Sequence, residues 1–270
     1  MPDKSTQQPP VQGKPAIVIT GASSGIGQAL ARLAVGEGAF LLLIGRSQPA
    51  LDDLAAELAA SGAQAAAVSI DLLASDAIER IEGELTGRGL YCDILINSAG
   101  FGVFGPAATT SHREHLDLIE VNIRALTDLT LRFLPGMVAR RRGGIINLGS
   151  ITGYAAGPNM STYYASKAFV NSFSAALSAE TAGTGVTVTC LEPGVVRTAF
   201  FERCGVGHSR LMKLMPRSSA ASTAEAGWRG FKAGRSTVIP RGINQLAVGI
   251  CRILPRSAIT RFVGALQRPR

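Results

Sequence analysis

The sequence has few of the residues that hold metal ions or form disulfides, with only four cysteines and three histidines in 270 residues. The cysteines lack metal-ligand spacing and a secretory context, which favours reduced thiols in a cytoplasmic protein. They are Cys92, Cys190, Cys204 and Cys251. His112 and His115 stand three residues apart, but no cysteine or acidic cluster accompanies them. We therefore expect no metal site.

Long hydrophobic runs are also missing. The longest uncharged stretch, Gly143 to Ser166, is rich in Gly, Ser, Asn and Pro, so we expect no membrane span. Residues 1–13 are polar, carry three prolines and lack the apolar centre of a signal peptide, which predicts a disordered lead-in. Residues 14–240 contain no Pro/Gly/Ser linker long enough to separate two folding units, and a single domain is expected there.

Acidic residues are absent from the last part of the chain. The net charge is +8 and no Asp or Glu follows Glu225, so residues 241–270 are expected to form a basic extension. Apolar residues recur in this extension at helical spacing and predict two short amphipathic helices. They are Ile243, Leu246, Ile250 and Ile253, then Ile259, Phe262, Val263 and Leu266.

Two interpretations of this basic extension are open. Its apolar faces can pack on the rest of the protein or on a second subunit, which is the interpretation we favour. The alternative is peripheral contact with a membrane that carries anionic lipid. Nucleic-acid binding is not expected, because the sequence has no helix-turn-helix, zinc-finger or aromatic RNA-binding signature.

Seven short apolar runs alternate with helical patterns along the chain. The predicted strands are Ala16–Thr20, Phe40–Ile44, Ala65–Ile70, Asp93–Asn97, Gly144–Gly149, Gly185–Cys190 and Ser236–Ile239. Helical patterns lie after the first run and near residues 51–60, 75–85, 112–140, 161–181 and 223–232. Continuous hydrophobicity is typical of parallel strands covered on both faces. The pattern predicts an α/β fold with a doubly wound, Rossmann-type parallel sheet and a ligand crevice at the carboxyl ends of its strands.

The first strand runs directly into a glycine-rich turn, TGASSGIG, and then into a helix. Gly21, Gly25 and Gly27 are spaced for a tight turn, for close approach of the backbone to a pyrophosphate, and for packing of the helix near the strand. The helix N-terminus supplies unpaired N–H groups and a positive dipole end for the anion. The turn therefore predicts a dinucleotide site.

The second strand ends at Gly45, Arg46 and Ser47, where an NAD enzyme usually has an acidic residue. No carboxylate is present there to repel a 2′-phosphate, and a guanidinium can bind one through paired, charge-assisted hydrogen bonds. We therefore expect NADP(H). The alternative is that Arg46 is only a solvent-facing residue after a strand.

Tyr163 and Lys167 lie one turn apart on the predicted helix 161–181, so their side chains share a face. An ammonium about 4 Å from a phenol, at an effective dielectric near 20, favours the phenolate by roughly 4 kcal/mol, or about three pKa units. Such a shift would bring Tyr163 close to neutral pH, where general acid–base catalysis is most effective. Tyr164 has Ala168 four residues on and lacks the ammonium partner.

The chain resembles the short-chain dehydrogenase/reductase family from about Lys14 to Ile239, because several motifs occur in the family's order. They are TGASSGIG at Thr20–Gly27, NSAG at Asn97–Gly100, Asn122 in a long helix, Ser150 after a strand, YYASK at Tyr163–Lys167 and PGVVRT at Pro193–Thr198. One departure is Ser98, where a second asparagine is usual.

The resemblance implies roles for four catalytic residues. Tyr163 would be the acid and base, and Ser150 would hydrogen-bond the substrate oxygen. Lys167 would hold the nicotinamide ribose and lower the pKa of the tyrosine. Asn122 would hold a water in a proton relay. A hydroxyl donor, a phenol and a cation are what a developing alkoxide needs as a hydride arrives.

The resemblance also implies the cofactor contacts. Asp71 would meet the adenine amino group, Asn97–Gly100 would line the adenine and central sheet region, and Thr198 would hold the carboxamide. The expected cofactor site comprises Gly21, Ser23, Ser24, Gly25, Ile26, Gly27, Arg46, Asp71, Leu72, Asn97, Ala99, Gly100, Tyr163, Lys167, Pro193, Gly194, Val196 and Thr198. The family usually assembles through two long helices, which begin here near His112 and Ser161, so a homo-oligomer is expected.

Residues of about 198–218 correspond to the family's mobile substrate lid, and they are apolar. Phe200, Phe201, Leu211, Met212, Leu214 and Met215 lie in this segment. They predict a lipophilic carbonyl or alcohol substrate held by adaptable Met and Phe side chains. Two alternatives are open: the apolar residues are core contacts of a short helix, or Arg203, Arg210 and Lys213 select an anionic group.

The sequence thus predicts an NADP(H)-dependent oxidoreductase that acts on a carbonyl or secondary alcohol. Two other functions fit the same motifs. One is a redox-neutral, epimerase-like use of the cofactor, and the other is a cofactor-binding regulatory protein. A regulator of this fold would often have lost Tyr163 or Lys167, and the chain keeps both.

Overall fold

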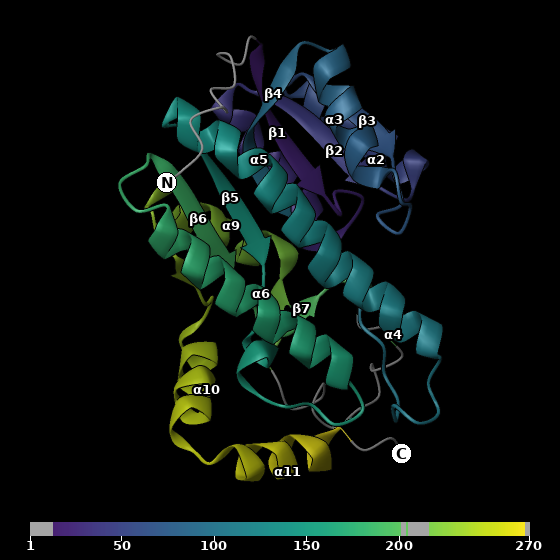
Figure 1. Ribbon diagram of the computed structural model, residues 1–270, viewed down its shortest axis with the longest axis vertical. Helices are drawn as coiled ribbons and strands as arrows, with labels where there is room; N and C mark the ends of the chain where they lie inside the picture. Colours follow the sequence, from purple (N-terminus) through teal and green to yellow (C-terminus); the bar gives the residue numbers. More distant parts are fainter. Residues whose placement is uncertain (1–12, 201–203, 205–215, 268–270) are drawn as a thin grey trace, which may run out of the picture.

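The computed structural model describes residues 13–200, 204 and 216–267. Seven strands form one sheet in the order β3-β2-β1-β4-β5-β6-β9, and every neighbouring pair is parallel (Figure 1). They are β1 (Lys14–Thr20), β2 (Phe40–Gly45), β3 (Ala65–Ser69), β4 (Leu90–Asn97), β5 (Gly143–Leu148), β6 (Val186–Leu191) and β9 (Thr237–Val238). Each predicted strand is confirmed, with its ends displaced by at most three residues.

Helices connect the strands and continue past the last of them. They are α1 (Gly25–Ala34), α2 (Gln48–Ala60), α3 (Ala77–Gly87), α4 (His112–Ile119), α5 (Leu126–Arg140), α6 (Ser161–Glu180), α9 (Ala220–Lys232), α10 (Gly242–Ile253) and α11 (Arg256–Leu266). Short helical segments are η1 (Val35–Glu37), η2 (Glu120–Ala125) and η3 (Ile151–Tyr154). A separate pair of two-residue strands joins β7 (Val196–Arg197) to β8 (Ser218–Ser219).

Both faces of the sheet are buried. In β1, Ile17 and Ile19 pack into a core cluster with residues of α1, α2 and α9, whereas Ala16 and Val18 pack into a second cluster with residues of α3, α5 and α6. All four side chains are fully buried. Successive residues of a strand point to opposite faces, so an uninterrupted apolar strand needs helices on both sides. The doubly wound fold is confirmed.

The strand order reverses at β1, which lies between β2 and β4. Chain connections leave the sheet in opposite directions from such a point, and a crevice opens outside the carboxyl ends of the two strands. The glycine-rich turn after β1 and the Asn97–Gly100 segment after β4 lie at this crevice.

The predicted helix over residues 112–140 is interrupted. A π-helical segment, η2, separates α4 from α5 and contains Asn122. Such π segments are rare and are frequently found at functional sites. This interruption was not predictable from the sequence, because a π turn changes the hydrogen-bond register without requiring proline or glycine.

The two predicted C-terminal helices are present as α10 and α11. On α11, Ile259 is buried and Val263 packs against the cluster around Tyr163. The predicted apolar residues of α10 are instead exposed, so this face does not pack on the rest of the described chain, and its packing on a second subunit stays a prediction. Within the described residues, no helix has the length and apolar character needed to cross a membrane.

Candidate active site

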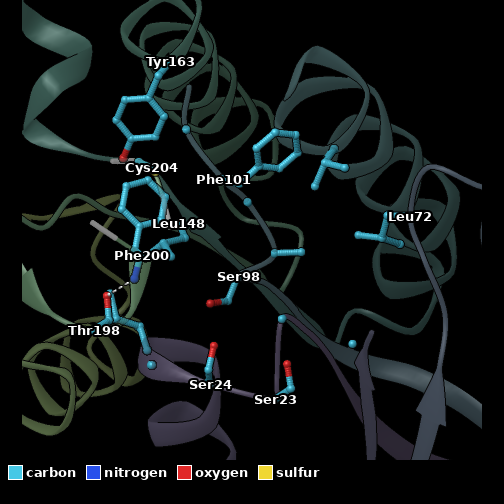
Figure 2. A pocket seen from close by; sticks show the side chains of 18 of the residues that line it. Ser23, Ser24, Leu72, Ser98, Phe101, Leu148, Tyr163, Thr198, Phe200 and Cys204 are labelled. Atoms are coloured by element: carbon cyan, nitrogen blue, oxygen red, sulfur yellow. Dashed lines mark hydrogen bonds between the residues drawn. The ribbon is translucent and has the colours of Figure 1, made fainter. Parts of the chain in front are cut away.

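A cleft of about 450 Å³ lies at the carboxyl ends of the central strands. This volume lies within the range of small-molecule and cofactor sites. The predicted residues that line it are Gly21, Ser23, Ser24, Gly25, Ile26, Arg46, Asp71, Leu72, Ala99, Gly100, Ser150, Tyr163, Lys167, Pro193, Gly194, Val196 and Thr198. Figure 2 shows Ser23 and Ser24 at one end of the cleft, Leu72 at one side, and Tyr163 at the far end.

The glycine-rich turn forms the floor of one end of the cleft. Gly21 and Gly25 have φ values of 67° and 61°, in the left-handed region that glycine adopts without strain. A Cβ on Gly21 would lie 2.8 Å from the backbone nitrogen of Ala99, so only glycine fits between the ends of β1 and β4. The helix α1 starts at Gly25 with Ser24 as its N-cap residue, which leaves backbone N–H groups facing the cleft. This end of the cleft fits a pyrophosphate.

Three predicted site residues do not line the cleft: Gly27, Asn97 and Asn122. Gly27 acts through packing, because a Cβ there would lie 2.4 Å from the carbonyl oxygen of Gly21. Asn97 is 2% exposed and donates hydrogen bonds to Thr130 Oγ1 (3.0 Å) and Asn147 Oδ1 (2.9 Å). The expectation that Asn97 lines the cofactor region is therefore wrong. Its side chain points into the interior and joins β4 to β5 and α5.

Asn122 holds the wall of the cleft. Its Nδ2 donates to the carbonyl oxygen of Phe101 (3.0 Å) and to Ser166 Oγ (3.1 Å), and its Oδ1 accepts from the Phe101 N–H (3.1 Å). A Cβ on Gly100 would lie 3.0 Å from Asn122 Oδ1 and 3.8 Å from Lys167 Nζ. The amide therefore ties η2 to the segment after β4, next to Lys167.

Tyr163 projects from the first turn of α6 and is 9% exposed. Its ring centre lies 5.4 Å from that of Phe200 (Figure 2). Burial raises the pKa of Tyr163 above its ordinary value, and the nearby side chains of Cys204 and Tyr164 raise it further. Hydrogen bonding with the hydroxyls of Ser150 and Thr152 acts in the opposite direction but is weaker.

Lys167 lies one turn further along α6, and its amine is directed at the backbone. Nζ donates to the carbonyl oxygen of Leu148 (2.7 Å) and lies 5.8 Å from the centre of the Tyr163 ring. Burial lowers the pKa of Lys167 to about 8, and the Cys190 thiol opposes this shift. The expectation that the ammonium brings the Tyr163 pKa down toward neutrality is wrong here, because desolvation of the phenol dominates.

Ser150 follows β5 and stands at the start of η3. Its hydroxyl donates to the carbonyl oxygen of Pro193 (3.3 Å) and accepts from the Thr152 N–H (3.1 Å). Asn171 fixes the backbone of Ser150 from both sides, because its Oδ1 accepts from the N–H and its Nδ2 donates to the carbonyl. The Ser150 hydroxyl is therefore held beside Tyr163 on a rigid segment.

Several residues of the cleft were not expected from the sequence. They are Ile44, Gly45, Ile70, Leu73, Phe101, Gly102, Glu114, Asp117, Val121, Leu148, Gly149 and Cys204. Ile44 lies next to the last residue of β2, and Ile70 directly follows β3. The rule that ligands bind at the carboxyl ends of parallel strands could therefore have found both residues. Glu114, Asp117 and Val121 come from α4 and η2, and nothing in their spacing indicates a ligand site.

An apolar cluster surrounds the Tyr163 end of the cleft. Its buried members are Val103, Leu118, Met160, Tyr163, Tyr164, Val195 and Cys204, with Phe101, Phe104, Ala155, Phe200 and Val263 packed against them. Of the predicted lid residues, Phe200 belongs to this cluster, while Phe201, Leu211, Met212, Leu214, Met215, Arg203, Arg210 and Lys213 lie outside the described residues. Thr198 accepts a hydrogen bond from the Phe200 N–H (3.4 Å), which sets the start of this segment (Figure 2).

Comparison with known proteins agrees with this geometry. Residues 15–205 match the family model of the short chain dehydrogenases. A short chain dehydrogenase of Pseudocercospora fijiensis is 37% identical over 192 residues, which span 70% of this chain and 61% of that protein. A fatty acyl-CoA reductase of Acinetobacter baylyi is 33% identical over 217 residues, which span 80% of this chain and 72% of that protein.

A solved structure has the same fold. The short-chain dehydrogenase from Sphingobium yanoikuyae, in complex with NADPH, matches this structure with a TM-score of 0.77 at 30% sequence identity. The match covers 90% of this chain and 97% of that chain. The chain therefore belongs to the short chain dehydrogenase family of oxidoreductases.

Proposed function

We propose that this protein transfers a hydride between NADP(H) and a carbonyl or secondary alcohol carbon of a lipophilic substrate. The observation that carries the proposal is the position of Tyr163, a buried phenol at the end of a dinucleotide-sized cleft, beside a fixed Ser150 hydroxyl and a buried Lys167. A proton donor at this place serves the oxygen of a carbonyl whose carbon receives the hydride.

The nicotinamide ring, when bound, supplies or accepts the hydride. In carbonyl reduction, the Tyr163 hydroxyl donates a proton to the substrate oxygen, and the Ser150 hydroxyl donates a hydrogen bond to the same oxygen. The raised pKa of Tyr163 keeps the phenol protonated at neutral pH, which is the state that reduction needs. Lys167 holds the nicotinamide ribose and places positive charge near the phenolate that forms. Asn122 holds a water that returns a proton along this route.

The cleft fits a dinucleotide with a 2′-phosphate. The turn at Gly21 and Gly25 and the start of α1 receive the pyrophosphate, and Asp71 lies at the cleft just after β3, where it can meet the adenine. Arg46 lines the cleft directly after β2, with no carboxylate at positions 45 to 47. The relative with bound NADPH, at 30% identity, supports the same cofactor.

Replacing Arg46 with alanine is expected to raise the KM for NADPH by about 10- to 100-fold, because a hydrogen bond to a charged group contributes about 1.5–3 kcal/mol. The KM for NADH should stay within about twofold, since NADH has no 2′-phosphate. Steady-state kinetics with each cofactor measure the two changes in KM. The matched control is Arg32→Ala, which removes an exposed arginine paired with Glu57 outside the cleft. An equal loss with both cofactors would contradict the assignment of Arg46.

A lipophilic substrate is supported by the apolar cluster around Tyr163, which includes Phe101, Met160 and Phe200. The similarity to a fatty acyl-CoA reductase points the same way. We expect kcat/KM for a series of straight-chain aldehydes or ketones to rise about threefold to fourfold per methylene, since each buried CH₂ contributes about 0.8 kcal/mol. The measurement is NADPH oxidation across the series. Equal or faster turnover of short polar carbonyls would exclude this substrate class.

We also propose a cytoplasmic homo-oligomer built on the outer surface of α4, α5 and α6. Large apolar side chains are exposed on all three of these helices, and a subunit contact would cover them. They are Leu116 and Ile119 on α4, Leu131 and Val138 on α5, and Phe169 on α6, with exposed fractions of 36–51%. This subunit contact does not include the C-terminal helices. It therefore does not explain the exposed apolar residues of α10.

A further inference from the structure

One face of α10 presents large apolar side chains to solvent. Ile243, Leu246, Ile250 and Ile253 recur at helical spacing and are 52%, 65%, 46% and 84% exposed. We refer to these four residues as the α10 apolar face. The opposite side of the helix is buried, with Asn244 and Val248 only 2% and 3% exposed. The helix therefore turns Asn244 and Val248 toward the protein and the α10 apolar face toward solvent.

The orientation of α10 is fixed by contacts with the catalytic region. Asn244 Nδ2 donates to the carbonyl oxygen of Pro240 (2.6 Å), and a Cβ on Gly194 would lie 2.6 Å from Asn244 Oδ1. The guanidinium of Arg252 lies 5.1 Å above the ring of Tyr154 in η3 and donates to its hydroxyl (3.4 Å). Because these contacts hold α10 from its inner side, rotation of the helix cannot bury the α10 apolar face.

Helix α11 lies at the substrate end of the cleft. Gln267 Nε2 donates to the Tyr164 hydroxyl (2.8 Å), and Val263 packs on the cluster that contains Tyr163. Figure 1 shows α10 and α11 following one another at an angle at the lower end of the molecule, beyond the carboxyl ends of the strands. Phe262 is 67% exposed on the outer side of α11. The exposed apolar residues of both helices thus lie at the end of the molecule that receives the substrate.

The charge of this region is entirely positive. No acidic residue follows Glu225, and the two helices and their flanks carry Arg241, Arg252, Arg256 and Arg261. Among the described residues, no ion pair involves any of these four arginines. A second copy docking through this surface would bring arginines against arginines. An anionic surface would neutralise them and cover the apolar residues at once.

We propose that α10 and α11 dock the protein on a membrane surface that contains anionic lipid. The α10 apolar face and Phe262 enter the boundary between headgroups and acyl chains, and the exposed Arg256 and Arg261 meet lipid phosphates and carboxylates. Docking in this orientation sets the Tyr163 end of the cleft next to the bilayer. The bilayer would then supply a lipophilic substrate directly to the cleft. This consequence of docking rests on the proposed function.

The test is sedimentation of the full chain with vesicles, without substrate or cofactor. We expect binding to vesicles of phosphatidylcholine plus phosphatidylserine, much weaker binding to phosphatidylcholine alone, and loss of binding at high salt. Leu246→Asp and Ile253→Asp should each raise the lipid concentration for half-binding at least about tenfold. Arg256→Gln and Arg261→Gln should each raise it about fivefold, since an arginine near an anionic surface contributes about 1 kcal/mol.

Two control variants define the result. Leu246→Met keeps an apolar side chain and should bind like the wild type, and Arg235→Gln removes an exposed arginine outside the two helices and should also bind normally. Full binding by Leu246→Asp, or equal binding to neutral vesicles, would overturn the proposal. A change in molecular mass of Leu246→Asp on gel filtration with light scattering would overturn it in favour of a subunit contact. Turnover of a water-soluble carbonyl without lipid tests the proposed function separately.

Discussion

Replacing Tyr163 with phenylalanine is expected to lower kcat for carbonyl reduction by about 10³-fold, within the range for loss of a general acid. The variant keeps the ring that packs 5.4 Å from Phe200 and loses only the hydroxyl. Binding of NADPH should change far less than kcat, because the substitution leaves the glycine-rich turn and Arg46 in place. Stopped-flow or steady-state NADPH oxidation gives kcat, and fluorescence titration gives cofactor affinity.

Tyr164 provides the matched control for this experiment. It is the next residue on α6 and is also buried, with 4% of its surface exposed, but its hydroxyl accepts a hydrogen bond from Gln267 (2.8 Å) on the side of α11. Tyr164→Phe should keep kcat within a few-fold and lose about 1 kcal/mol of stability with that hydrogen bond. Turnover that survives in Tyr163→Phe and disappears in Tyr164→Phe would mean that the wrong phenol has been assigned.

The fold was predictable from the sequence because its signals are local. Buried parallel strands are continuous apolar runs in the sequence. Gly21 and Gly25 indicate a turn whose backbone conformation other residues rarely adopt. The predicted strands, the sheet type, the glycine-rich turn and the position of Arg46 follow from these signals and from the strand-end rule. The family resemblance then added the roles of Ser150, Tyr163 and Lys167.

The features that were not predicted depend on the direction in which a side chain points. Asn97 ends β4 beside the cleft, but the alternation of a strand turns its amide into the interior, toward Asn147 and Thr130. The spacing of Tyr163 and Lys167 placed them on one face of α6, yet it did not reveal that the ammonium turns toward Leu148 or that burial dominates both pKa values. The spacing of the apolar residues in α10 is that of any amphipathic helix, so the sequence did not show that this face is exposed.

Replacing Lys167 with methionine is expected to lower kcat by about 10²-fold or more, because the variant loses the charge beside the developing phenolate and the group that holds the cofactor ribose. NADPH affinity should fall with it, which distinguishes Lys167→Met from Tyr163→Phe. The control is Lys232→Met, which removes a half-exposed lysine paired with Glu37 far from the cleft. Unchanged cofactor binding in Lys167→Met would contradict the role of the amine at the ribose.

The same variant should change how stability depends on pH in the cofactor-free protein. The pKa of Lys167 is about 8 in the folded chain, against an ordinary value of 10.5. Between these pH values the unfolded chain holds a proton on this amine that the folded chain has released, so the lysine makes stability rise with pH. Below pH 8 both states are protonated, and the full penalty of burying the ammonium applies.

Between about pH 7.5 and about pH 9.5, the wild type should therefore gain about 2 kcal/mol of unfolding free energy relative to Lys167→Met, which has no amine to titrate. Urea denaturation of both proteins at the two pH values measures this difference, and other titrating groups cancel in the comparison. Parallel pH profiles for the two proteins would show that the amine is solvated rather than buried. Under the proposed function, the folded protein keeps this cost because the positive charge is needed where the phenol ionises.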